Sequence, residues 1–233
     1  MQTEAPKSSS SGTVQAVLFD VDGTLVDSNE AHVQAWVEVF REFGHEVSAE
    51  DVRQQIGKGG DQLMPVFLSK EEVEGKGRAI EQRRKELFKT RYQPGLKGFP
   101  GTRELVQRLL SDRRQIVLAS SSSGEELEVN KRLARIDDLV HEATARDDVQ
   151  QSKPHPDIFE AALAKIDGVP AERAIVIGDS PYDAQAARKA GLRCIGLLSG
   201  GFPEGWLREA GCVAVYRDVA DLLAQYDSSP LAL

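Results

Sequence analysis

The 233-residue chain contains very little cysteine. Cys194 and Cys212 are the only two, and they are not spaced as a CxxC pair. Such sparse use fits a reducing compartment, where we expect each cysteine to be a small buried residue, neither a metal ligand nor a disulfide partner. Residues 1–13 are polar and rich in serine and lack the apolar stretch of a secretory signal, so we interpret them as a disordered lead-in. These features predict a cytoplasmic protein.

Long apolar runs and basic blocks are also missing. No run approaches the roughly 20 apolar residues of a membrane helix, which argues against a membrane partner. The net charge is −8 and no basic, aromatic-rich face is visible, which argues against nucleic acid. The four histidines show no metal-ligand spacing, so we expect no zinc site. The chain should act on a small molecule, as a monomer or a weak homodimer.

Short apolar segments alternate with helical patterns along most of the chain. This alternation predicts an α/β fold with a mainly parallel, Rossmann-like sheet. The strands are expected over 14–19, 115–119, 139–143, 174–177, 194–198 and 213–215. Helices are expected over 101–113, 125–134, 156–166, 182–190 and 219–226.

One stretch, from residue 28 to about residue 92, breaks this alternation. It contains no convincing strand, and helical patterns cover 29–43, 49–56, 61–68 and 70–91. We therefore predict an all-helical module over 28–95, inserted into a core made of 14–27 and 96–233. Residues 70–91 carry eight basic and five acidic side chains, which we interpret as a solvated helix face.

The most informative residues are Asp20 and Asp22, which end the first apolar strand. Side chains at i and i+2 of an extended chain point the same way, so these two carboxylates should lie side by side. Open α/β sheets place their sites at the carboxyl ends of strands. Two close carboxylates suit either a Mg²⁺ site or a nucleophile beside an acid.

Three further segments bear polar side chains just after predicted strands. Ser120 begins a run of serines that could hold an anion or only cap the next helix. Lys153, in a stiff Lys-Pro-His-Pro segment, is either a fixed cation for phosphate or a solvated surface lysine. Asp179 ends an apolar strand, and Asp183 is either a helix-start carboxylate or part of a metal site. Together these groups suit attack by a carboxylate on a phosphate, which needs neutralising charge.

These motifs resemble those of the haloacid dehalogenase-like hydrolase superfamily. The segment Asp20-Val-Asp-Gly-Thr-Leu-Val-Asp27 resembles its first motif, and Ser120, Lys153 and 178–183 resemble the other three. The inserted helices resemble the cap of the subgroup that includes phosphoglycolate phosphatase and β-phosphoglucomutase. The resemblance implies a sheet with strand order 5-4-1-2-3.

The resemblance also implies roles for individual residues. Asp20 would be the nucleophile that forms an aspartyl-phosphate, and Asp22 would protonate the leaving alcohol and then activate water. Thr24 would help to fix Asp22. Ser120 and Lys153 would hold the phosphoryl group. Mg²⁺ would be bound by Asp20, the Asp22 carbonyl and Asp179, with Asp183 beside it.

Differences from particular members of the superfamily reduce the number of activities that the sequence fits. Asp22 argues against a true dehalogenase, which lacks an acid at this position. Phosphonoacetaldehyde hydrolases also lack it and need a cap lysine, to which Lys58 does not clearly correspond. The sequence favours a phosphomonoester phosphatase acting on a small phosphorylated metabolite. A phosphosugar mutase is the alternative, and a non-catalytic phosphate sensor is a third reading.

Substrate selection should fall to a glycine-rich turn between two module helices, over 55–61. If this turn faces the core, its neighbours could reach the leaving group when the module closes. A plain helix–helix turn is the alternative. The candidate substrate-binding residues are Gln54, Lys58 and Gln62 from the module and Ser121 from the core.

Overall fold

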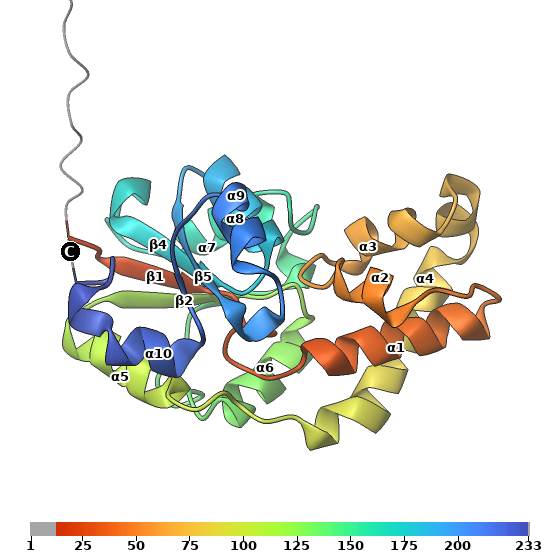
Figure 1. Cartoon of the computed structure of the whole chain (residues 1–233), viewed down its shortest axis with the longest axis horizontal. Helices are drawn as coiled ribbons and strands as arrows, with labels where there is room; N and C mark the ends of the chain where they lie inside the picture. Colours follow the sequence, from red (N-terminus) through yellow and green to blue (C-terminus); the bar gives the residue numbers. More distant parts are fainter. Residues whose placement is uncertain (1–12, 233) are drawn as a thin grey trace, which may run out of the picture.

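The computed structural model describes residues 13–232, and a single parallel sheet organises them (Figure 1). The sheet has six strands in the order β3-β2-β1-β4-β5-β6, with every neighbouring pair parallel. Read from the β6 edge, this order contains the expected 5-4-1-2-3, so the predicted fold class is confirmed. The strands are β1 (Ala16–Phe19), β2 (Gln115–Ala119), β3 (Ala143–Thr144), β4 (Ala174–Gly178), β5 (Arg193–Leu197) and β6 (Cys212–Tyr216).

Helices cover both faces of the sheet, which explains why its central strands are apolar throughout. All four residues of β1 are buried, as expected for a strand covered on both sides. Val17 and Phe19 belong to a cluster that includes α5, α6 and α10, whereas Ala16 and Leu18 pack with α7, α8 and α9. These helices are α5 (Thr102–Ser111), α6 (Gly124–Leu133), α7 (Asp157–Leu163), α8 (Pro181–Lys189), α9 (Glu204–Ala210) and α10 (Val219–Ala224).

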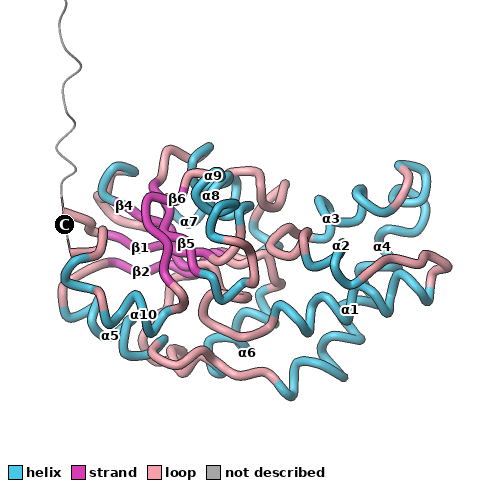
Figure 2. Tube along the Cα trace, in the orientation of Figure 1, coloured by secondary structure: helices cyan, strands magenta, loops and turns pink. Residues whose placement is uncertain are grey.

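Four further helices form a group of their own, which we call the helical module. They follow β1 in the chain and lie beyond the sheet in Figure 1 and Figure 2. Trp36, Phe40, Leu63 and Ile80 contribute to a separate hydrophobic cluster among them. The helices are α1 (Asn29–Glu42), α2 (Ala49–Arg53), α3 (Gly60–Phe67) and α4 (Lys70–Leu87), followed by a π-helical turn over Phe88–Tyr92.

Two expectations differ from the structure. The strand expected over 139–143 is reduced to Ala143–Thr144, because the amides of Leu139 and Val140 both donate to the Ile136 carbonyl and form a turn. The sequence does not predict helix α9, because glycines and Pro203 interrupt the pattern around it; the helix begins directly after Pro203. The expectation for residues 1–13 lies outside the described residues, apart from Thr13.

Both cysteines are buried and free, and they lie opposite each other on β5 and β6. The prediction of small buried residues is therefore confirmed. Among residues 13–232, no helix has the length and apolar character needed to cross a membrane.

Candidate active site

The residues after three adjacent strands meet at the carboxyl edge of the sheet. Asp20 follows β1, Ser120 follows β2 and Asp179 follows β4. Because β1 lies between β2 and β4, Asp20 lies at the centre of the group, and its amide extends the ladder by donating to the Ile177 carbonyl at 2.9 Å. Parallel pairing thus brings together residues that lie far apart in the sequence.

Lys153 reaches this group from the loop between β3 and α7. Its side chain is 1% exposed, and Nζ donates to carboxylate oxygens of Asp20 and, at 2.7 Å, of Asp183. Burial alone would lower the pKa of Lys153, but the two carboxylates outweigh burial and raise it. The alternative of a solvated surface lysine is therefore wrong, and Lys153 is a fixed buried cation.

Three buried carboxylates form an acid cluster, and two of them contact this lysine. Ligand oxygens of Asp20, Asp179 and Asp183 all lie within 4.8 Å of one another. Burial, together with repulsion from neighbouring acids, raises the pKa of both Asp20 and Asp179. One lysine does not balance three buried carboxylates, and oxygen donors are what Mg²⁺ prefers. The donor set therefore fits a magnesium ion.

Asp183 is a helix-start carboxylate, one of the two readings that the sequence left open, and it also lies in the acid cluster. It is the third residue of α8, and its Oδ2 accepts from the backbone and the hydroxyl of Ser180, which completes a capping box. Its Oδ1 accepts from Lys153 at 2.7 Å. Because both oxygens have partners, Asp183 is well placed to hold Lys153 in the acid cluster.

Thr24 contacts different acids from the one expected. Its hydroxyl lies 3.0 Å from Asp179 Oδ1 and 3.3 Å from Asp20 Oδ2, so it joins these two carboxylates and does not fix Asp22. The reason is the turn at Gly23, whose φ of +77° carries the chain back toward β4. A Cβ at Gly23 would lie 2.3 Å from Asp179 Oδ2, so only glycine allows this approach.

The Asp22 carboxylate is held apart from the acid cluster by a set of donors. Its two oxygens accept hydrogen bonds from both the core and the helical module. These donors are Ser28 (2.8 Å), Ser122 (2.8 Å), His32 Nε2 (3.1 Å), Asn130 (3.2 Å) and Ser120 (3.4 Å).

The donors determine the charge state of Asp22. Burial would raise its pKa, but His32, Ser28 and Ser122 together outweigh burial and hold the pKa well below its ordinary value. In this arrangement Asp22 is a carboxylate that can accept a proton, and it must leave some of its donors in order to give one.

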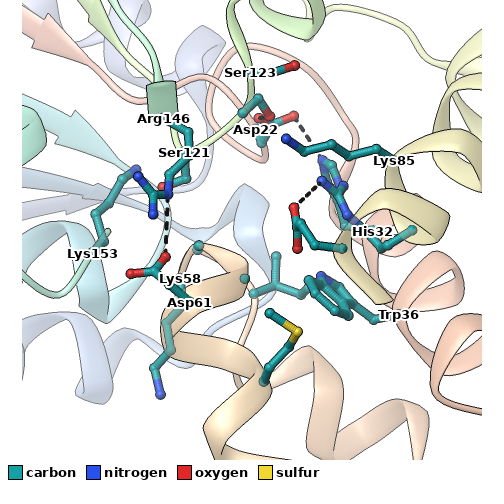
Figure 3. A pocket seen from close by; sticks show the side chains of 18 of the residues that line it. Asp22, His32, Trp36, Lys58, Asp61, Lys85, Ser121, Ser123, Arg146 and Lys153 are labelled. Atoms are coloured by element: carbon teal, nitrogen blue, oxygen red, sulfur yellow. Dashed lines mark hydrogen bonds and ion pairs between the residues drawn. The ribbon is translucent and has the colours of Figure 1, made fainter. Parts of the chain in front are cut away.

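A cavity of about 620 Å³ lies between the acid cluster and the helical module (Figure 3). Asp20, Asp22 and Lys153 form part of its core side, and Trp36 and Met64 part of its module side. The cavity wall therefore has charged side chains on its core side and apolar side chains on part of its module side, a combination found in many sites for small molecules.

The structure separates the predicted substrate-binding residues. The described residues that line the cavity include Lys58 and Ser121 but not Gln54 or Gln62. Gln62 instead donates to Asp61 at 3.0 Å, and Gln54 lies within 3.5 Å of Glu50. The two glutamines therefore bond within the module and do not line the cavity. Lys58 lines the cavity, but its Nζ also bonds within the module, where it donates to Gln55 at 2.6 Å.

Helix α4 is not only a solvated face, and this corrects the sequence interpretation. Arg84 is 7% exposed, lines the cavity and contacts Glu81 at 3.2 Å and His32 Nδ1 at 3.5 Å. Lys85 also lines the cavity (Figure 3). Net charge along a helix does not reveal which of its turns face inward, so sequence reasoning missed these residues.

Sequence reasoning also missed His32 and Asn29. Asn29 Nδ2 donates to Asp179 at 2.8 Å, and the His32 ring stacks on Phe88 with centroids 4.1 Å apart. One signal was available: His32 precedes Trp36 by four positions, which places both on one face of the expected helix.

The chain is similar to known proteins in both sequence and fold. Residues 17–197 match a family model described as haloacid dehalogenase-like hydrolase. A Pseudomonas syringae hydrolase of known structure has a TM-score of 0.81 and 32% identity, covering 92% of this chain and 98% of its own.

Two curated relatives differ in length. A phosphorylated carbohydrates phosphatase of Thermotoga maritima is 27% identical over 205 residues, covering 88% of this chain and 94% of its own. Protein SUPPRESSOR OF QUENCHING 1, chloroplastic, of Arabidopsis thaliana is 34% identical over 216 residues. This match covers 91% of our chain but only 20% of the Arabidopsis protein.

The chain belongs to the haloacid dehalogenase-like hydrolase family, as the match over residues 17–197 shows. The predicted family and the prediction of a hydrolase are confirmed, and the relative named as a phosphatase supports that class.

Proposed function

We propose that the protein is a Mg²⁺-dependent phosphatase that hydrolyses a small phosphomonoester through an aspartyl-phosphate on Asp20. The observation that carries this proposal is the division of labour between two neighbouring acids. Asp20 lies against Lys153 and Thr24 in the acid cluster, whereas Asp22 is turned toward hydroxyl, imidazole and amide donors. One acid is placed for attack and the other for proton transfer.

In the proposed first step, an Asp20 oxygen attacks phosphorus, and the bond from phosphorus to the leaving-group oxygen breaks. Lys153 offsets the negative charge that two anions bring together. In this step Asp22, which has left some of its donors and taken up a proton, gives that proton to the leaving oxygen and returns to the carboxylate state that its donors favour. In the second step, water attacks the phosphorus of the aspartyl-phosphate while Asp22 takes a proton from the water; the bond from phosphorus to the Asp20 oxygen breaks, which releases phosphate and restores the Asp20 carboxylate.

Mg²⁺ would be held by carboxylate oxygens of Asp20 and Asp179 and by the Asp22 carbonyl. When bound, the ion would supply positive charge to the phosphoryl oxygens. Asp183 would act on Lys153, with which it pairs. Asn29 and Thr24 would orient Asp179, because both donate to its oxygens.

The substrate's leaving group would occupy the cavity next to the helical module. A cavity of about 620 Å³ has room for a group much larger than phosphate, and Trp36 offers a flat apolar surface beside the charged groups of α4. This combination suits a polar, sugar-like leaving group, and a relative named phosphorylated carbohydrates phosphatase supports it. Lys58 and Ser121 would contact the substrate.

The helical module would act as a cap over 28–95, on a core of 14–27 and 96–233. Closing of the cap would exclude water from the aspartyl-phosphate and bring module residues to the leaving group. Support comes from the separate hydrophobic cluster of the module, which lets it move as a unit.

A phosphate-release screen over sugar phosphates, phosphoglycolate and nucleotides, with Mg²⁺ present, tests the proposal. We expect release from at least one of them, and Asp20→Asn should abolish turnover while the circular dichroism spectrum stays unchanged. Persisting turnover in Asp20→Asn would show that Asp20 is not the nucleophile.

The same screen separates the alternatives. In the presence of a bisphosphate activator, a phosphosugar mutase would form an isomerised sugar phosphate, whereas a phosphatase would release free phosphate. Inactivity on every compound combined with tight binding would identify a phosphate sensor.

A further inference from the structure

Two charged side chains in the cavity wall contact each other, one from the helical module and one from the core. Asp61 lies in the first turn of α3 in the helical module, and Arg146 begins a short 3-10 turn after β3 in the core. Their Oδ1 and Nε atoms are 3.4 Å apart, and both side chains are about a quarter exposed, at 28% each (Figure 3). This is a direct ion pair between module and core.

Arg146 also braces the loop that leads to Lys153. Its NH1 group donates to the Val149 carbonyl at 2.8 Å, and NH2 lies 3.5 Å from the Gln150 carbonyl. One side of the guanidinium therefore faces its own loop while Nε faces the module. Since a guanidinium is planar and rigid, the two sets of contacts are geometrically linked.

Asp61 contacts the same loop a second time, directly before Lys153. Its Oδ2 accepts a hydrogen bond from the Ser152 amide at 3.1 Å. Ser152 is 2% exposed, so without this carboxylate the amide would lose its acceptor in a mostly buried setting. The next residue, Lys153, donates to Asp20.

The module comes this close because residue 59 is glycine. A Cβ at Gly59 would lie 2.1 Å from the Ser152 hydroxyl and 2.5 Å from its Cβ. Any larger residue would push the turn before α3 away from the core. Gly59 belongs to the glycine-rich turn over 55–61, and its lack of a side chain lets Asp61 reach the loop before Lys153.

We propose that Asp61 is a positioning residue: when the module closes, its carboxylate fixes the Ser152–Lys153 segment, with Arg146 as its second anchor. Module closure and placement of the phosphate-facing lysine are then one event. The role in turnover rests on the proposed phosphatase function, whereas the contact itself does not.

Hydrogen exchange of the whole chain tests the contact without any substrate. In Asp61→Ala, the Ser152 amide should exchange roughly tenfold faster, the loss expected for one charge-assisted hydrogen bond. Glu46→Ala, which removes an exposed acid of the same module, should leave the rate unchanged. Equal exchange at Ser152 in the wild type and in Asp61→Ala overturns the proposal, whether or not the protein is a phosphatase.

Kinetics on a substrate from the screen test the consequence for turnover. Asp61→Ala should lower kcat by roughly tenfold with a smaller change in KM, and Asp61→Asn, which keeps an acceptor for the amide, should recover part of the loss. Arg146→Ala combined with Asp61→Ala should be no more than about twofold slower than the worse single variant, because the two residues act as a unit. Fully multiplicative losses, or a loss confined to KM, would contradict a positioning role.

Discussion

At the scale of single residues, the two acids of the first motif differ in the side chains that contact them. Asp20 faces a lysine and other carboxylates, and Asp22 faces neutral donors and His32. The sequence predicts that both acids lie at one strand end, because the i, i+2 rule is local. It does not predict His32, because that contact depends on how α1 packs over the core.

Removing the His32 imidazole should therefore impair Asp22 without touching Asp20. We expect His32→Ala to lower kcat by roughly tenfold, since a buried carboxylate loses one charge-assisted donor and its fixed orientation. Steady-state kinetics check this, with His141→Ala, an exposed histidine, as the control. His32→Gln can still donate to Asp22 and should retain more activity than His32→Ala; equal losses in the two variants would assign His32 to packing alone.

At the scale of elements, the N-terminal boundaries of helices follow capping motifs that can be recognised in the sequence. Ser69 and Ser180 each begin a helix with a complete capping box, at α4 and α8. Such boxes are local and therefore predictable. The sequence places β3 too early. Val140 is apolar because it is buried in a turn, and such a residue cannot be told from a strand residue by sequence alone.

The two capping serines provide a matched test of structure against function. Ser69→Ala and Ser180→Ala should each cost about 1 kcal/mol of unfolding free energy. Only Ser180→Ala should also lower activity, because the Ser180 hydroxyl holds the Asp183 oxygen opposite the one that pairs with Lys153. Chemical denaturation and phosphate release measure the two effects. Equal activity in both variants would show that Asp183 needs no support from Ser180.

At the scale of the whole molecule, the site is built from both halves of the architecture. Strand alternation and the four motifs predict the core side well, because they are set by sheet topology. The sequence predicts the module side poorly: Lys58 lines the cavity but its Nζ donates to Gln55, and Gln54 and Gln62 do not line the cavity. Side-chain direction on the module depends on how its helices dock, which periodicity alone does not encode. A monomer or weak homodimer in the cytoplasm stays a prediction.

Binding of Mg²⁺ should stabilise the whole fold, because the unfolded chain does not assemble the acid cluster. At a concentration about 100 times its Kd, the ion should add about 2.7 kcal/mol, which corresponds to a Tm rise of roughly 5–10 °C for a chain of this size. Thermal unfolding with and without Mg²⁺ measures the shift. Asp179→Asn should lose most of it and Asp137→Asn, an exposed acid, none; an undiminished shift in Asp179→Asn would place the ion elsewhere.

The position of β1 between β2 and β4 has a consequence for how the chain is made. Thr24 and Asp179, whose side chains meet in the site, are 155 positions apart, and β4 is the strand that brings them together. A ribosome-bound chain that has not yet released β4 carries a finished first motif on a strand with one open edge. Such an edge invites pairing with other chains. The last third of the sequence therefore covers this open edge of β1 as well as completing the acid cluster.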